Sequence, residues 1–566
     1  MSKNWKGHLL GFAVAALCVA PTTAIAGGGP ACGDLNDDSN VNIVDVLLMA
    51  NCVAGLCDAG AQCGGGGLAA CANTFGDGAV VNASDLNQLV FEVAGLETLH
   101  DLCAPIGTPL ACAGTEVITG TISSSQIWPS GCDIELDDTV FIETPPGGPT
   151  TVLTIGAGTT IKGRKTVTPG NGAAALIFLP GSKIAAIGGA STPIVFTSDQ
   201  PAGARTKGDW GGVMFNGRST VNRPNCLGTA EGVPSPFGGC DANDSSGVAR
   251  YVRIEFAGLP ISANNELNIW TMNGLGKGTD FSYIHANAGI DDCIEWFGGT
   301  LDTHHMVASG CADDGLDWQL GYTGTTQYAL YVANGPLLDD GNTDSRGFEG
   351  DNSEFGNDDL PRSNPKFCNV TLVGPEDLDT DSDSGILFRR GTAGQVGNVI
   401  VTGFRDAGVE LREDATGVVA CAQRDGAFSG RVTGNLVIDG GVFYDNGTRA
   451  TLGDPIATEH AKSGAAGEGR QPALCSTADW LDALDNVTEN GTNPCNPGLE
   501  AAYPDPNDPS SLFAGAPTFT GDCDVEPVDC TLISDAFEDA PFIGAFDPAG
   551  PATGWLNSDW NSFEID

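Results

Sequence analysis

The chain has few basic residues, since only 25 Lys and Arg stand against 72 Asp and Glu among 566 residues. The formal net charge of −47 would repel nucleic-acid phosphates and anionic lipid, so we expect neither as a partner. After residue 26 no apolar run approaches the ~20 residues of a transmembrane helix. The 80 Gly and 32 Pro exclude a helix-rich protein, and they lack the repeat of collagen. The 41% of hydrophobic residues still suffices for a large core.

The familiar enzyme signatures are also missing. The sequence contains no Gly-x-Ser-x-Gly elbow, phosphate-binding loop, dinucleotide fingerprint or His-Glu-x-x-His motif. Any catalysis must therefore come from side chains that the fold assembles.

The N-terminus has the three parts of a secretory signal peptide. Lys3 and Lys6 precede the apolar run Leu9–Ala20, and small residues surround a cleavage pattern at Ala24-Ile25-Ala26. We therefore predict a signal peptide over residues 1–26 and a mature protein in the medium, at the cell surface or in the periplasm.

Eighteen of the 19 cysteines follow this segment, and an even number in an exported chain favours disulfides over metal or redox sites. Pairs that are close in sequence would each close a single loop, although spacing alone leaves the connectivity open. The pairs of this kind are Cys226/Cys240, Cys475/Cys495 and Cys523/Cys530.

Residues 27–104 contain two loops with the pattern of a calcium site. Ca²⁺ takes six to eight oxygen ligands, and alternate residues of a tight loop can supply them. Each loop runs into an apolar helical stripe, and the second has one inserted residue and fewer acids. The ligands in the first loop are Asp34, Asn36, Asp38, Asn42, Asp45 and the carbonyl of Asn40, and those in the second are Asp77, Asn82 and Asp85.

This pair of loop-helix units resembles the dockerin domain, the calcium-dependent plug of polysaccharide-degrading complexes. The resemblance covers about residues 31–99 and implies a cohesin-like protein as a partner. A cysteine-rich insert between the two loops and the altered second loop depart from the dockerin pattern.

From about residue 115 short β-branched runs alternate with turn residues. The stretch 153–161 aligns with 176–184 at an offset of 23, and 291–296 aligns with 313–318 at an offset of 22. A period of 22–23 with short strands is typical of one coil of a parallel β-helix. The alignments predict three buried stacks of residues from successive coils: Ile155/Phe178, Ile161/Ile184 and Ile294/Leu316.

Five segments in a fixed order resemble a family of secreted bacterial proteins with a pectate-lyase-like right-handed β-helix. The segments are 208–213, 251–258, 295–299, 347–351 and 543–546. The resemblance implies the fold and carries no settled activity. We therefore expect a mainly β protein, a right-handed parallel β-helix with a small α-helical calcium module at its N-terminus.

The expected divisions of the chain follow from these patterns. They are the signal peptide (1–26), the dockerin-like module (27–104), the β-helix (105–414), its continuation with a cysteine-rich insert or cap (415–535) and a C-terminal coil and tail (536–566).

Acidic residues fall at matching positions of successive coils. Carboxylates stacked ~4.8 Å apart repel one another unless a cation bridges them or some are protonated, so their pKa values should be perturbed. The members of this acid ladder are Asp292, Glu295, Asp314, Asp317 and Glu349, with Asp291 and Asp313 beside them.

The ladder admits three interpretations. It is a calcium-bridged face that is structural or binds an acidic or neutral polysaccharide, a glycan-cleaving site, or a solvated row of turns. Binding predicts an exposed aromatic strip of Trp270, Trp296 and Trp318. Cleavage predicts a cleft where Arg389 or Arg390 meets the ladder, with an arginine as the base of a lyase or two carboxylates as the pair of a glycoside hydrolase.

The sequence thus favours a secreted, calcium-binding β-helix protein that binds or presents polysaccharide. A polysaccharide lyase or glycoside hydrolase, and a self-assembling surface protein, are the alternatives.

Overall fold

The computed structural model describes residues 107–165, 174–262, 265–333, 345–375, 384–404, 407–421 and 436–446 and, between 480 and 565, residues 480, 484, 486–488, 494–499, 504–505, 508, 511–557 and 559–565. The chain divides into two compact units, Met1–Gly107 and Thr108–Asp566. The predicted signal peptide and both predicted calcium loops lie outside the described residues. No described helix is long and apolar enough to cross a membrane.

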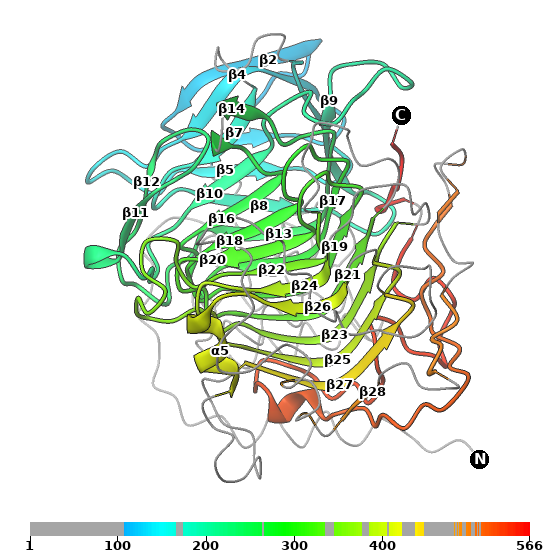
Figure 1. Cartoon of the computed structure of the whole chain (residues 1–566). Coiled ribbons are helices and arrows are strands. Elements are labelled where there is room, and N and C mark those ends of the chain that lie inside the picture. The colour runs from blue at the N-terminus through cyan, green and yellow to red at the C-terminus, as the bar shows by residue number, and fades with distance from the viewer. Residues whose placement is uncertain are drawn as a thin grey trace, which may run out of the picture. The chain divides into compact units, whose positions relative to one another are not determined.

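The second unit is built on one large sheet whose 24 strands all pair in parallel, as a parallel β-helix requires (Figure 1). Two small antiparallel pairs, β11 (Leu227–Thr229) with β12 (Pro236–Gly238) and β14 (Pro260–Ser262) with β15 (Asn265–Glu266), lie outside it. Its strands are β1 (Thr108–Pro109), β2 (Thr115–Ile122), β3 (Gln126–Trp128), β4 (Asp133–Ile142), β5 (Val152–Ile155), β6 (Thr160–Gly163), β7 (Ala175–Phe178), β8 (Lys183–Ile187), β9 (Ile194–Ser198), β10 (Val213–Asn216), β13 (Gly247–Glu255), β16 (Trp270–Asn273), β17 (Asp280–Asn287), β18 (Ile294–Phe297), β19 (Asp302–Ser309), β20 (Leu316–Gln319), β21 (Thr325–Val332), β22 (Phe348–Gly350), β23 (Lys366–Val373), β24 (Ser384–Phe388), β25 (Gly394–Thr402), β26 (Ala407–Leu411), β27 (Leu436–Tyr444) and β28 (Val487–Thr488). The described helical segments are η3 (Pro224–Cys226), α5 (Asp414–Cys421) and η4 (Cys530–Leu532).

Each coil of the central region contributes one short and one long strand. The short strands β10, β16, β18, β20, β22, β24 and β26 pair in that order, and so do the long strands β13, β17, β19, β21, β23, β25 and β27. Each long strand contains a residue with positive φ, such as Tyr283 (φ 54°), His305 (φ 56°) and Asn398 (φ 53°). This left-handed conformation bends the strand, so one long strand serves two sides of the coil.

The interior of the coils is filled by stacked apolar side chains. Ile294 pairs with Leu316 and Trp296 with Trp318 in successive strands, and all four are buried. The predicted Ile294/Leu316 stack is therefore confirmed.

The two predicted stacks nearer the N-terminus are wrong. Ile155 pairs with Ala186, and Ile161 pairs with Phe196. Both aligned stretches are a strand, a turn and a strand, but β5 pairs with β8 and not with β7. The repeat in the sequence correctly marks both strand-turn-strand units. It does not predict which strand of one unit pairs with which strand of the other.

Five disulfides join described residues, and they only partly follow sequence proximity. The Cys226–Cys240 pair is confirmed. The predicted pairs Cys475/Cys495 and Cys523/Cys530 are wrong, because Cys495 is bonded to Cys523 and Cys530 to Cys368. The remaining bonds are Cys112–Cys132 and Cys293–Cys311.

The C-terminal strap, which we define as residues 528–557 and 559–565, explains the distant disulfide. It runs back along the bends of the long strands (red in Figure 1). Asn398 Nδ2 donates to the Val528 carbonyl (2.9 Å), Asn369 Nδ2 to the Phe542 carbonyl (2.7 Å) and Asn287 Nδ2 to the Glu564 carbonyl (2.7 Å). The strap therefore ties successive coils together from outside.

Candidate functional site

A cleft of about 300 Å³ lies over the short strands β18, β20 and β22, and acidic side chains dominate its wall. Two arginines and two amides complete the lining. The lining residues are Glu231, Glu266, Asn268, Asp291, Asp292, Glu295, Asp313, Asp314, Asp317, Gln319, Arg346, Glu349 and Arg389.

The floor of the cleft is the predicted acid ladder. Glu295 pairs in register with Asp317, and Asp317 with Glu349, on three neighbouring strands. Their side chains reach the cleft because successive residues of a strand point to opposite faces.

The same alternation turns the tryptophans inward, so the predicted exposed aromatic strip is wrong. Trp270, Trp296 and Trp318 are at most 1% exposed and belong to the interior cluster. Trp296 lies two residues after the inward-facing Ile294 and therefore shares its face, while Glu295 between them points outward. These rings offer no surface to a sugar.

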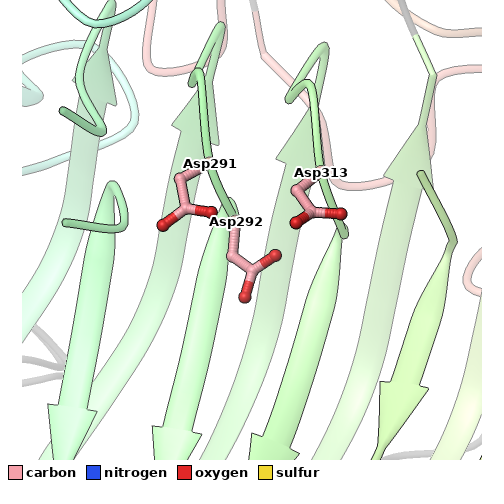
Figure 2. Close-up of side chains that lie close together, drawn as sticks. All are labelled: Asp291, Asp292 and Asp313. Atoms are coloured by element: carbon pink, nitrogen blue, oxygen red, sulfur yellow. The ribbon is translucent and has the colours of Figure 1, made fainter. Parts of the chain in front are cut away.

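A second row of acids comes from the turns that precede the strands. Figure 2 shows Asp291 and Asp292 before β18 and Asp313 before β20, with their carboxylates side by side. Asp292 Oδ1 accepts from the Asp314 amide (2.9 Å), and Asp314 Oδ1 accepts from the Arg346 amide (2.7 Å). Each turn is thus held by the acid of its neighbour.

Burial and mutual repulsion disfavour the charged forms of these acids. Burial, reinforced by the Asp317 and Glu231 charges, raises the pKa of Glu295 well above its ordinary value. Burial also raises the pKa of Asp292 well above its ordinary value, and the Asp291 and Glu295 charges add to this shift. The pKa of Asp317 rises to about 6 through burial, although Arg389 opposes the shift.

Two groups of carboxylates are close enough to hold a cation. Asp291, Asp292 and Asp313 form one group, and Asp292, Glu295 and Asp317 form the other. Within each group the ligand oxygens lie within 4.8 Å of one another. Asp292 belongs to both groups.

One atom of the second group shows that the residues present fit a cation. Asp317 is only 7% exposed, and its Oδ1 has no hydrogen-bond partner among the described residues. Glu295 is better satisfied, since Gln319 Nε2 donates to its Oε1 (3.0 Å) and Asn268 Nδ2 donates to its Oε2. A buried carboxylate oxygen without a donor is costly, and a hard cation would satisfy it.

The basic end of the cleft is built around Glu349 and Asp351. Arg346 Nη1 lies 2.5 Å from Glu349 Oε2, and Arg389 pairs with Glu349 and, through Nε, with Asp351 Oδ1 (2.9 Å). Arg390 Nη1 binds Asp351 Oδ2 (2.7 Å) and is not part of the lining. Of the two predicted arginines, Arg389 therefore meets the acid ladder.

Sequence reasoning missed several lining residues. Asn268 and Arg346 stand two residues before their strands, as Asp292 and Asp314 do, so the repeat frame could have identified them. Glu231 and Glu266 come from the segments around the two small antiparallel pairs. No repeat marks these two residues.

Comparison with known proteins supports the fold. Residues 120–469, more than half of the chain, match the family model described as a pectate-lyase like beta helix domain. No curated protein and no solved structure matches the chain.

Proposed function

The chain belongs to the family of pectate-lyase-like β-helix domains, and from this premise we propose that its acidic cleft binds a hard divalent cation and, through it, a carboxylated polysaccharide. The observation that carries the proposal is the group Asp292, Glu295 and Asp317, whose oxygens lie within 4.8 Å of one another. Within the described part of the chain, no hydrogen-bond donor reaches Asp317 Oδ1.

Calcium is the cation that suits these ligands. It takes six to eight oxygens in flexible geometry, whereas Mg²⁺ demands a stricter octahedron. The three carboxylates of the group leave coordination positions for oxygens of a bound ligand. When bound, the cation would offset two of the three negative charges of the group and could coordinate a carboxylate of a uronate chain.

The charge of the cleft explains why the polysaccharide should be carboxylated and why its binding should depend on the cation. Without a cation the acids of the lining repel a uronate, whereas a bound cation weakens that repulsion and offers the uronate carboxylate direct coordination. A neutral glycan would gain little from this switch.

The test is retention of the full chain on immobilised polygalacturonate and alginate, with CaCl₂ or with chelator, beside calorimetric titration with CaCl₂. We expect retention only with calcium, and loss of both retention and calcium affinity in Glu295→Gln. The matched control is Glu410→Gln. Glu410 continues the stack of Glu349 two strands further on, but its carboxylate is paired with Arg412 (2.7 Å). Retention that ignores calcium in the wild type would contradict the proposal.

Elimination of the bound uronate is a second candidate, because Arg389 lies in the cleft wall. In a lyase reaction a base removes the proton beside the uronate carboxyl group, the bond to the glycosidic oxygen breaks, a double bond forms in the sugar, and the departing oxygen takes a proton from water. Burial and the charges of Arg390 and Arg346 lower the pKa of Arg389 to about 10, which makes its neutral form easier to reach.

Ultraviolet absorbance of the unsaturated uronate tests this second candidate. Turnover that is lost in Arg389→Lys and kept in Arg390→Lys would assign the base, since Arg390 shares Asp351 but does not line the cleft. Retention without any turnover would leave a binding protein.

The remaining expectations complete the proposal. The five disulfides fit an oxidising compartment, and we assign the protein to the cell exterior. Calcium in the N-terminal loops and a cohesin-like partner for that module rest on the sequence pattern.

A further inference from the structure

A loop with many internal hydrogen bonds leaves the β-helix immediately after the strand that carries Glu349. It occupies residues 351–365, between β22 and β23. Asn352 is wholly buried, and its Nδ2 donates to the carbonyls of Asn357 (3.0 Å) and Asp359 (3.1 Å). Its Oδ1 accepts from the Ser363 amide (2.8 Å). The base of the loop is therefore held in one conformation.

The tip of the same loop is held by a second buried side chain. Ser353 Oγ accepts from the amides of Phe355 (3.2 Å) and Gly356 (3.3 Å) and donates to Asp359 Oδ2 (3.0 Å). The backbone of Phe355 is thus positioned before any ligand arrives.

The ring of Phe355 stands largely in solvent. It is 61% exposed, and no other described Phe, Tyr or Trp side chain is exposed. The Arg223 guanidinium lies over one face, 3.7 Å from the ring centroid. Such a contact orients the ring and backs it from one side.

The loop stands beside the cleft. Asp351, its first residue, holds Arg389 of the cleft wall (2.9 Å). The lining residue Glu231 has its pKa raised to about 7, by burial first and by the Glu266 charge second. The charge of Glu354, in the loop, adds to this shift. Phe355 stands four residues after Asp351, in the turn that the Ser353 hydroxyl holds, and therefore lies close to the basic end of the cleft.

We infer that Phe355 is a stacking subsite for a pyranose ring of a polysaccharide chain whose neighbouring uronate occupies the cleft. One face of a pyranose is a row of C–H groups, which packs on an aromatic ring as other apolar groups do. The inference rests on the proposed function and adds to it a sugar contact that needs no charge.

Affinity for chains of different length tests the inference. The probes are polygalacturonate and monomeric galacturonate, each with CaCl₂, and calcium alone. Phe355→Ala should weaken polygalacturonate binding roughly tenfold, and Phe355→Trp should keep or strengthen it. Neither variant should change the affinity for galacturonate or for calcium, because the cation ligands are untouched.

Leu360→Ala is the matched control, since Leu360 is an apolar side chain of the same loop that is 76% exposed. It should leave polygalacturonate affinity unchanged, and equal losses in both variants would overturn the sugar subsite. If the wild type binds polygalacturonate and Phe355→Ala binds it equally well, the subsite alone is wrong. If the wild type binds no uronan, the proposed function and the subsite both fail.

Discussion

Asp317→Asn should stabilise the cation-free protein, although it removes a side chain of the proposed site. The pKa of Asp317 rises from 3.8 to about 6 on folding, because burial outweighs the attraction of Arg389. The folded chain then holds a proton that the unfolded chain has released. The contribution of Asp317 to stability is therefore most favourable below pH ~4 and is lost as the pH rises from ~4 to ~6. At neutral pH, keeping Asp317 charged in the folded protein costs about 3 kcal/mol of stability, and an asparagine at this position avoids that cost.

Calcium should cancel this advantage. A ligand at a hundred times its Kd stabilises the folded state by about 3 kcal/mol. The wild type gains this amount, whereas the variant lacks one of the three carboxylates and gains less. The two proteins should therefore have similar stability in calcium and should differ in chelator.

The assay is thermal unfolding between pH 4 and pH 8, in chelator and in CaCl₂. We expect the Tm of Asp317→Asn to exceed that of the wild type by about 3 °C in chelator at neutral pH, and the gap to close toward pH 4. Glu410→Gln serves as the control, because it breaks the buried pair with Arg412 and should lower the Tm in both solutions. An Asp317→Asn variant that is less stable than the wild type in chelator would refute the reasoning.

Three further predictions concern the framework. Replacing Cys368 and Cys530 together by alanine should lower the free energy of unfolding by up to about 5 kcal/mol, because the bond spans 162 positions; unchanged denaturant unfolding would contradict this. Trp318→Ala should lower the free energy of unfolding by about 4 kcal/mol in the same denaturant assay, since the ring is wholly buried. A loss below ~1 kcal/mol would contradict the packing of this ring in the interior. Asn398→Ala removes both hydrogen bonds between this side chain and the Val528 backbone (2.8 and 2.9 Å), and it should lower the free energy of unfolding by about 3 kcal/mol. Backbone amides of the strap should then exchange hydrogen faster, and unchanged exchange would show that other contacts hold the strap.

The repeat in the sequence was sufficient to predict the centre of the fold and of the site. The match between 291–296 and 313–318 predicts that Ile294 stacks with Leu316 and Glu295 with Asp317, and the strands pair in that register. The reason is local, because equivalent residues of successive coils occupy equivalent positions whenever the intervening loops are short. Alternation along the strand also determines that Trp296 shares the face of Ile294, so its burial was within reach of the sequence.

Only the tertiary structure decided which distant segments complete the cleft and close the sides of the helix. Glu231 and Glu266 reach the acids from segments without a repeat, and Cys530 finds Cys368 because the strap returns along the coils. The stretch 153–161 shows the same limit, since its pattern matches 176–184 while β5 pairs with β8. Periodicity determines how a strand faces its neighbours, whereas the path of a loop depends on packing between residues far apart in the chain, and no local pattern records it.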